Sequence, residues 1–259
     1  MIGTYFFIIV YPLLLIASLS VGKRVADYVS PRRPTWKPLG VENGLVGFYA
    51  LLISFSLAQA GNNARERTGY IHDTSGKLAL MLRKSKLYDL DLQRRLYYHV
   101  SDILDVQLSG IQTSKAEVLK TVEKMEELDY KFDEKMLKQV QVNQANKQHV
   151  SELIADLEQM ESNYFRLLYS YHRSTPTLIL FILILFSLFI GFLLGFLRGM
   201  LHTKMHISAI IFAVMSYIII YAIQDLDNPV GGFIKPDFTE IQNIKRLYDD
   251  YFQSIIIKK

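Results

Sequence analysis

The sequence predicts an all-α membrane protein with four transmembrane helices and a helical bundle inserted between the second and the third. Half of the 259 residues are hydrophobic, and they gather in four stretches long enough to cross a hydrocarbon core about 30 Å thick, which takes roughly 20 apolar residues in a helix. Most of the charge lies in residues 64–174, where basic and acidic side chains are equal in number. This stretch contains no proline, which favours long helices.

The first two spans are expected at Thr4–Val21 and Leu39–Ala60. A signal peptide followed by a buried core helix is the alternative for this half of the chain. It is disfavoured because no basic segment precedes the first apolar run. In addition, Lys23 and Arg24 stand where a cleavage site needs small residues.

The other two spans are expected at Thr177–Leu197, which is uncharged, and Met205–Ile223. The turn between them carries Arg198 and Lys204, and the loop of residues 22–38 is also basic. Short basic loops favour the cytoplasmic side of a membrane. We therefore expect these two loops on that side, and both termini and the insert on the extracytoplasmic side.

The insert is expected to consist of helices that extend the second and third spans. The second span continues through Arg65–Lys86, and further helices are expected at Asp89–Leu108 and Ser114–Met136. A last helix, from about Lys138, would run on to Gly199 for roughly 90 Å at 1.5 Å per residue.

Only Ser174–Pro176 would interrupt this last helix. The part of the helix before this interruption carries apolar residues alternately three and four positions apart, which keeps one side of it apolar over three heptads. We call this side the seam. Residues 138–174 could therefore form the insert's own core or bind a protein partner. The seam consists of Val150, Leu153, Leu157, Met160, Tyr164, Leu167 and Tyr171.

These patterns divide the chain into four segments. Residues 1–63 hold the first two spans, 64–174 the helical insert and 175–224 the third and fourth spans. Residues 225–259 hold a turn-rich break and then an amphipathic helix opened by Pro236 and Asp237. That helix lies either on the membrane surface or against the bundle, and its sequence leaves both possibilities open.

Nothing in the sequence indicates an enzyme, a cofactor or a metal site. The absence of cysteine excludes disulfides, thiolate catalysis and Cys-ligated metals, and phosphate-binding, nucleophile-elbow and zincin motifs are missing. His202 and His206 are four residues apart but lie in a polar turn beside Lys204, where interfacial histidines are ordinary. A net charge of +4 spread over loops also argues against nucleic-acid binding.

The spans contain two stripes of small and polar residues. In the third span such residues recur every four positions, which favours close helix packing: Ser187, Gly191, Gly195 and Gly199. The stripe of the second span either packs or lines a pore, because this helix is also the more polar of the two. The candidate pore-lining residues are Asn43, Gly47, Ser54, Phe55, Ala58 and Asn62.

Charged residues cluster where the second and fourth spans end on the same side. Arg65, Glu66 and Arg67 follow the second span, and Asp225 and Asp227 end the fourth. We predict that Arg65 or Arg67 pairs with one of these aspartates. The cluster is then either a pore mouth or a structural clasp between helix ends.

Two motifs resemble the bestrophin-like family of small bacterial membrane proteins. One is Gly47-Phe-Tyr-Ala-Leu-Leu-Ile-Ser-Phe-Ser-Leu-Ala58 followed by Asn63-Ala-Arg-Glu-Arg67, and the other is Leu226-Asp-Asn-Pro-Val-Gly-Gly232 with Pro236-Asp237-Phe238. The order of spans and insert matches along nearly the whole chain. Val230 departs from the common Phe, and no Glu-Trp pair follows Tyr97-Tyr98.

The resemblance implies a bacterial cytoplasmic (inner) membrane and kinship to bestrophins, which are pentameric anion channels lined by their second helix. The leading hypothesis is therefore a homo-oligomeric channel for anions or small solutes in the lipid bilayer. The alternative is a membrane-anchored sensor or scaffold whose insert binds a partner or self-associates.

Overall fold

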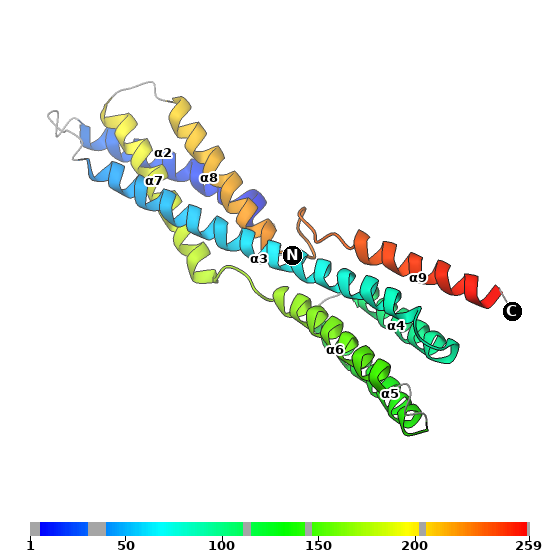
Figure 1. The fold of residues 1–259 in the computed structure, drawn as a ribbon. Helices are drawn as coiled ribbons and strands as arrows, with labels where there is room; N and C mark the ends of the chain where they lie inside the picture. Colours follow the sequence, from blue (N-terminus) through cyan, green and yellow to red (C-terminus); the bar gives the residue numbers. More distant parts are fainter. Residues whose placement is uncertain (1–5, 31–39, 111–114, 143–146, 202–205, 258–259) are drawn as a thin grey trace. The chain divides into compact units, whose positions relative to one another are not determined.

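The computed structural model describes residues 6–30, 40–110, 115–142, 147–201 and 206–257 (Figure 1). Within these ranges the chain forms helices joined by turns, with no strand, which confirms the all-α prediction. Four helices are long and apolar enough to cross a membrane, as expected: Phe7–Val29, Glu42–Ser85, Thr177–Met200 and Ile207–Leu226.

The chain divides into two compact units. The first, which we call the membrane unit, consists of Met1–Asn63 and Ser174–Asn228. The second, the bundle unit, consists of Ala64–Arg173 and Pro229–Lys259. Helix α3 (Val41–Ser85) contributes its first half to the membrane unit and its second half to the bundle unit.

In the membrane unit, a π-helical turn, η1 (Phe6–Val10), leads into α2 (Tyr11–Val29). Pro12 lies in the first turn of α2, where its missing N–H leaves no hydrogen bond unmade. The expected end at Val21 is wrong, because α2 continues through Lys23 and Arg24 to Val29. Long basic side chains within a spanning helix can still reach the interface.

Helix α2 packs closely against α7 (Thr177–Met200). The hydroxyl of Tyr11 donates a 2.9 Å hydrogen bond to Ser187 Oγ, and Ser18 Oγ donates one of 2.5 Å to the carbonyl of Leu188. Helix α8 (His206–Leu226) completes the unit. Its Ile220 and Ile223 are fully buried with Leu15 of α2 and Leu183 of α7.

In the bundle unit, α4 (Leu90–Gly110) and α5 (Lys115–Val142) follow the second half of α3, where the sequence predicts helices at Asp89–Leu108 and Ser114–Met136. Helix α6 (Lys147–Ser170) brings its seam into the core of this unit, where Leu153 and Met160 are fully buried. Asp156 is 8% exposed, and Lys84 of α3 donates a 2.5 Å hydrogen bond to its Oδ2 atom.

The expected continuous helix from Lys138 to Gly199 is wrong. In the described residues, α5 runs to Val142, and α6 begins at Lys147 and ends at Ser170. A non-helical connection then leads to α7. Pro176 has φ −51° and ψ 132°, and the residue before a proline is itself biased away from helical angles. The interruption is therefore longer than the proline alone suggested.

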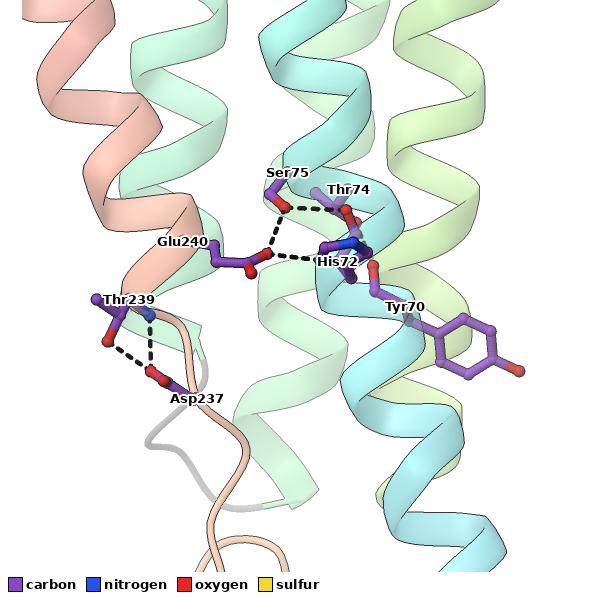
Figure 2. A network of polar contacts seen from close by, with 7 residues as sticks. All are labelled: Tyr70, His72, Thr74, Ser75, Asp237, Thr239 and Glu240. Atoms are coloured by element: carbon purple, nitrogen blue, oxygen red, sulfur yellow. Dashed lines mark hydrogen bonds and ion pairs between the residues drawn. The ribbon is translucent and has the colours of Figure 1, made fainter.

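The C-terminal helix α9 (Thr239–Ile257) packs against the bundle rather than standing apart from it. Tyr248 is 1% exposed, and its hydroxyl donates a 3.1 Å hydrogen bond to the carbonyl of Leu78 in α3. At the start of α9, Glu240 accepts hydrogen bonds from His72 Nδ1 at 2.8 Å and Ser75 Oγ at 3.0 Å (Figure 2). These hydrogen bonds lower the pKa of Glu240.

Candidate pore-lining surface

Helix α3 has one buried and one uncovered face. It is a single helix of 45 residues, about 67 Å long at 1.5 Å per residue. Its buried residues recur at spacings of three and four, which marks one side of a helix. That buried side comprises Tyr49, Ile53, Ser56, Ala60, Asn63, Arg67, Ile71, Thr74 and Leu78.

All six candidate pore-lining residues lie away from this buried side. Phe55 is 62% exposed, and Ser54 uses its hydroxyl for a 2.8 Å hydrogen bond to the carbonyl of Ala50 within the same helix. Thus none of them is covered by the helices that the structure describes. The exposed set is Asn43, Gly47, Ser54, Phe55, Ala58 and Asn62.

The glycines of α3 differ sharply from those of α7. A methyl group added at any glycine of α3 would meet open space. Only one of these glycines is a candidate pore-lining residue, and the series continues along the helix beyond the last candidate: Gly44, Gly47, Gly61, Gly69 and Gly76. At Gly195 of α7, by contrast, it would collide with the carbonyl oxygen of Leu19. Small residues therefore serve helix packing in α7, whereas in α3 they leave a face open.

The four small residues of α7 face α2. Ser187 accepts the hydrogen bond of Tyr11, and Gly191 lies beside Ser18. A methyl group at Gly199 would collide with the Cβ atom of Ala26. This close approach is what small residues permit between helices in lipid, where van der Waals packing drives association.

At the far end of the second span, three adjacent charged residues have different surroundings. Arg65 is exposed, whereas Arg67 is 2% exposed and donates a hydrogen bond of 3.4 Å from Nη1 to the carbonyl of Ser170. Glu66 forms a 3.0 Å ion pair with Arg173. Of the two arginines, only Arg65 projects from the uncovered face.

This difference could have been found in the sequence. Each residue of a helix is rotated by about 100° from the one before it. Arg65 and Arg67 are two positions apart, so they point to nearly opposite sides of α3 and cannot share a face. Arg67 also continues the spacing of the buried residues Ala60 and Asn63. Burial raises the pKa of the nearby Tyr171 to about 12, against the opposing effect of the Arg67 charge.

Asp225 and Asp227 are both 8% exposed at the end of α8. Asp227 Oδ2 accepts a 2.8 Å hydrogen bond from the backbone N–H of Thr175, just before α7. Sequence reasoning missed Thr175 and Arg173, because the partners of both are remote in the chain. The predicted pairing of Arg65 or Arg67 with one of these aspartates stays a prediction.

No metal centre is evident in the part of the chain that the structure describes, which holds no group of three or more His, Asp or Glu residues placed to bind an ion. His202 lies outside the described residues, and for His206 only the backbone is described. The pair therefore offers no geometry from which a metal site could be argued.

The fold and the uncovered helix face define an integral membrane protein with four spanning helices. Residues 41–235 match the bestrophin-like domain, and the chain belongs to the bestrophin-like family. No curated protein matches the sequence. A crystal structure of a membrane protein variant has the same fold, with a TM-score of 0.72 over 94% of this chain and 98% of that chain, at 13% identity.

Proposed function

We propose that the chain is one subunit of a homo-oligomeric channel for anions or small solutes, with α3 lining the pore. The observation that carries this proposal is the uncovered face of α3, which holds small and polar residues such as Gly47, Ser54 and Asn62. Closed rotational symmetry would bring this face from each copy to a common axis. Membership of the bestrophin-like family supports the proposed channel function, because bestrophins are anion channels.

The chemistry of the uncovered face suits a pore that opens and closes. Ser54 and Asn62 offer polar groups, whereas Phe55 and Phe48 are 62% and 51% exposed and would form apolar rings. Apolar constrictions can gate a pore by dewetting. Arg65, exposed at the end of the span, would enrich anions at the mouth by electrostatic attraction.

The alternative of a scaffold that binds a partner through residues 138–174 has less support. Its recognition surface would be the seam of α6, but Leu153 and Met160 are fully buried and Leu167 is 2% exposed within the bundle unit. The seam is thus occupied by the chain's own core. It offers no apolar surface on which a partner could dock without unfolding the bundle.

Anion flux from liposomes that contain the purified protein tests the proposal. Wild type is compared with Ser54→Trp, which fills the uncovered face, and with Phe181→Trp, which adds an indole at a 60% exposed position of α7. We expect flux above that of empty liposomes, blocked by Ser54→Trp and retained in Phe181→Trp. Equal flux from both variants, with both still assembled, would overturn the assignment of α3.

A further inference from the structure

The membrane unit contains a groove between α2, α7 and α8 with a volume of about 620 Å³, within the range of about 300–1,000 Å³ that ligand sites occupy. Its walls are mostly apolar, with Leu15 and Leu19 of α2 facing Ala213 and Tyr217 of α8. We call this cavity the α2–α8 groove. It is separate from the uncovered face of α3, none of whose residues line it.

One end of the groove is cationic. Lys23 and Arg24 of α2 and Arg198 of α7 line it there, together with one acid, Asp27. These residues come from the last turns of two neighbouring helices, so they lie at one end of the cavity rather than along it. The residues of α8 that line the groove carry no charge.

The apolar part of the groove is about as long as one leaflet of a bilayer. Along α2 the lining runs from Pro12 to Asp27, and the part from Pro12 to the first cation, Lys23, rises about 16 Å at 1.5 Å per residue. The hydrocarbon core is about 30 Å thick, so the apolar part spans about half of it. The cations then stand at the depth where phosphate headgroups begin.

The walls are open toward the bilayer. Ile16 of α2 and Ile210 of α8 are 58% and 59% exposed, and both line the groove. A ligand that enters from the hydrocarbon can therefore reach it sideways. It would meet apolar walls along its length and several hydrogen-bond donors at one end.

We propose that the α2–α8 groove binds an anionic phospholipid, with an acyl chain along the apolar walls and the headgroup phosphate held by Lys23, Arg24 and Arg198. Both halves of the ligand are required by the lining. An apolar solute would make no use of the three cations, which outnumber the single acid of the lining, and a free anion would leave the apolar length unfilled. A neighbouring copy would have to supply carboxylates against these cations, whereas a phosphate provides acceptors in the form that arginine prefers.

Native mass spectrometry of the full-length protein, taken from nanodiscs of equal parts phosphatidylcholine and phosphatidylglycerol, tests this proposal. We expect wild type to retain phosphatidylglycerol in preference to phosphatidylcholine. Lys23→Gln with Arg24→Gln should lower that preference by up to about thirtyfold, the scale expected for two cations near anionic headgroups. Arg83→Gln with Lys120→Gln, at exposed positions of the bundle unit, removes the same charge and should leave the preference unchanged.

A second pair of variants tests the apolar part without changing the charge. Ala213→Trp fills the groove and should abolish retention of the lipid, whereas Ile218→Trp, on α8 outside the groove, should not. Thermal melting confirms that each variant is folded. Equal retention of the two lipids by wild type would overturn the proposal. So would a loss of oligomers in Ala213→Trp with no lipid bound to wild type, since the occupant would then be a second copy.

Discussion

The backbone N–H of Thr175 donates a 2.8 Å hydrogen bond to the Oδ2 atom of Asp227. The two residues are 3% and 8% exposed, so the bond is buried. It ties the connection that precedes α7 to the end of α8, in the motif Leu226-Asp-Asn-Pro. The carboxylate thus fixes the point at which two spanning helices meet, and this role accounts for an acid at the end of a hydrophobic helix.

Asp227→Ala should destabilise the protein by about 1–3 kcal/mol, the usual cost of leaving a buried donor without its acceptor. Asp227→Asn should cost less, because the amide oxygen can still accept the Thr175 N–H. Thermal melting in detergent measures both variants. Asp73→Ala, at an exposed position, serves as the control and should change stability by no more than about 0.5 kcal/mol. Equal melting of Asp227→Ala and the control would contradict this role.

Gly195→Ala should disrupt the packing of α2 against α7. The added methyl group would meet the backbone of Leu19, which cannot move without displacing the helix, and overpacking costs about 1–3 kcal/mol or more. Gly69→Ala is the matched control in α3, where a methyl group meets open space. There alanine should be neutral or stabilise the protein by up to about 1 kcal/mol. Unfolding of the two variants in parallel measures the difference in stability. If Gly195→Ala lost no more stability than Gly69→Ala, the close packing of α2 against α7 would be refuted.

The bundle unit should lose stability as the pH rises toward 8. Burial, a side-chain hydrogen bond with Asp129 and the charges of Asp129, Glu126 and Asp133 raise the pKa of Glu161 to about 8. Because the folded state binds this proton more tightly than the unfolded state, stability is greatest below the ordinary pKa of about 4.5 and falls from there to about 8.

Glu161→Gln should flatten that pH dependence and stabilise the protein at pH 8. The gain should be about 1–2 kcal/mol, because partial exposure of Glu161 screens the repulsion. Melting temperatures between pH 5 and about 8.5 provide the measurement. Glu127→Gln is the control, since its ion pair with Lys131 is on the surface. A slope in Glu161→Gln as steep as in wild type would rule out Glu161 as its source.

Arg65→Glu should reduce the preference of the proposed channel for anions, because Arg65 projects from the uncovered face of α3. The effect should be severalfold in low salt and weaker at about 1 M, where the screening length is about 3 Å. Reversal potentials in a salt gradient measure it. Lys120→Glu makes the same change of charge on α5 and should leave selectivity as it is. Unaltered selectivity and conductance in Arg65→Glu would mean that the residue is not at the mouth.

Much of the fold could be predicted because the signals are local. Four apolar runs separate cleanly from the charged insert, and the bilayer sets their length. The unbroken pattern of α3 from its apolar part into the insert likewise predicted one long helix, and Val41–Ser85 is that helix. The family resemblance, based on short motifs at the ends of the second and fourth spans, is confirmed by the match over residues 41–235.

What the sequence left open or mispredicted depended on contacts between distant residues. The hydrophobic pattern of α9 suits a membrane surface as well as a bundle, and only the burial of Tyr248 against α3 distinguishes them. The break before α7 is held at Thr175 by a hydrogen bond to Asp227, which lies 52 residues further along the chain. Arg67 is a different case, because its position in the helix, in register with Ala60 and Asn63, already pointed to the buried side.

The most direct test of the uncovered face uses the fact that the chain contains no cysteine. Single cysteines are introduced at Ser54 and Ala58, on that face, and at Phe181 as the exposed control on α7. A water-soluble, thiol-reactive methanethiosulfonate is then applied while anion flux is recorded from liposomes. We predict that it reduces the flux of Ser54→Cys and Ala58→Cys and leaves that of Phe181→Cys unchanged. Flux that persists in all three, with labelling confirmed by mass, would contradict a pore lined by α3.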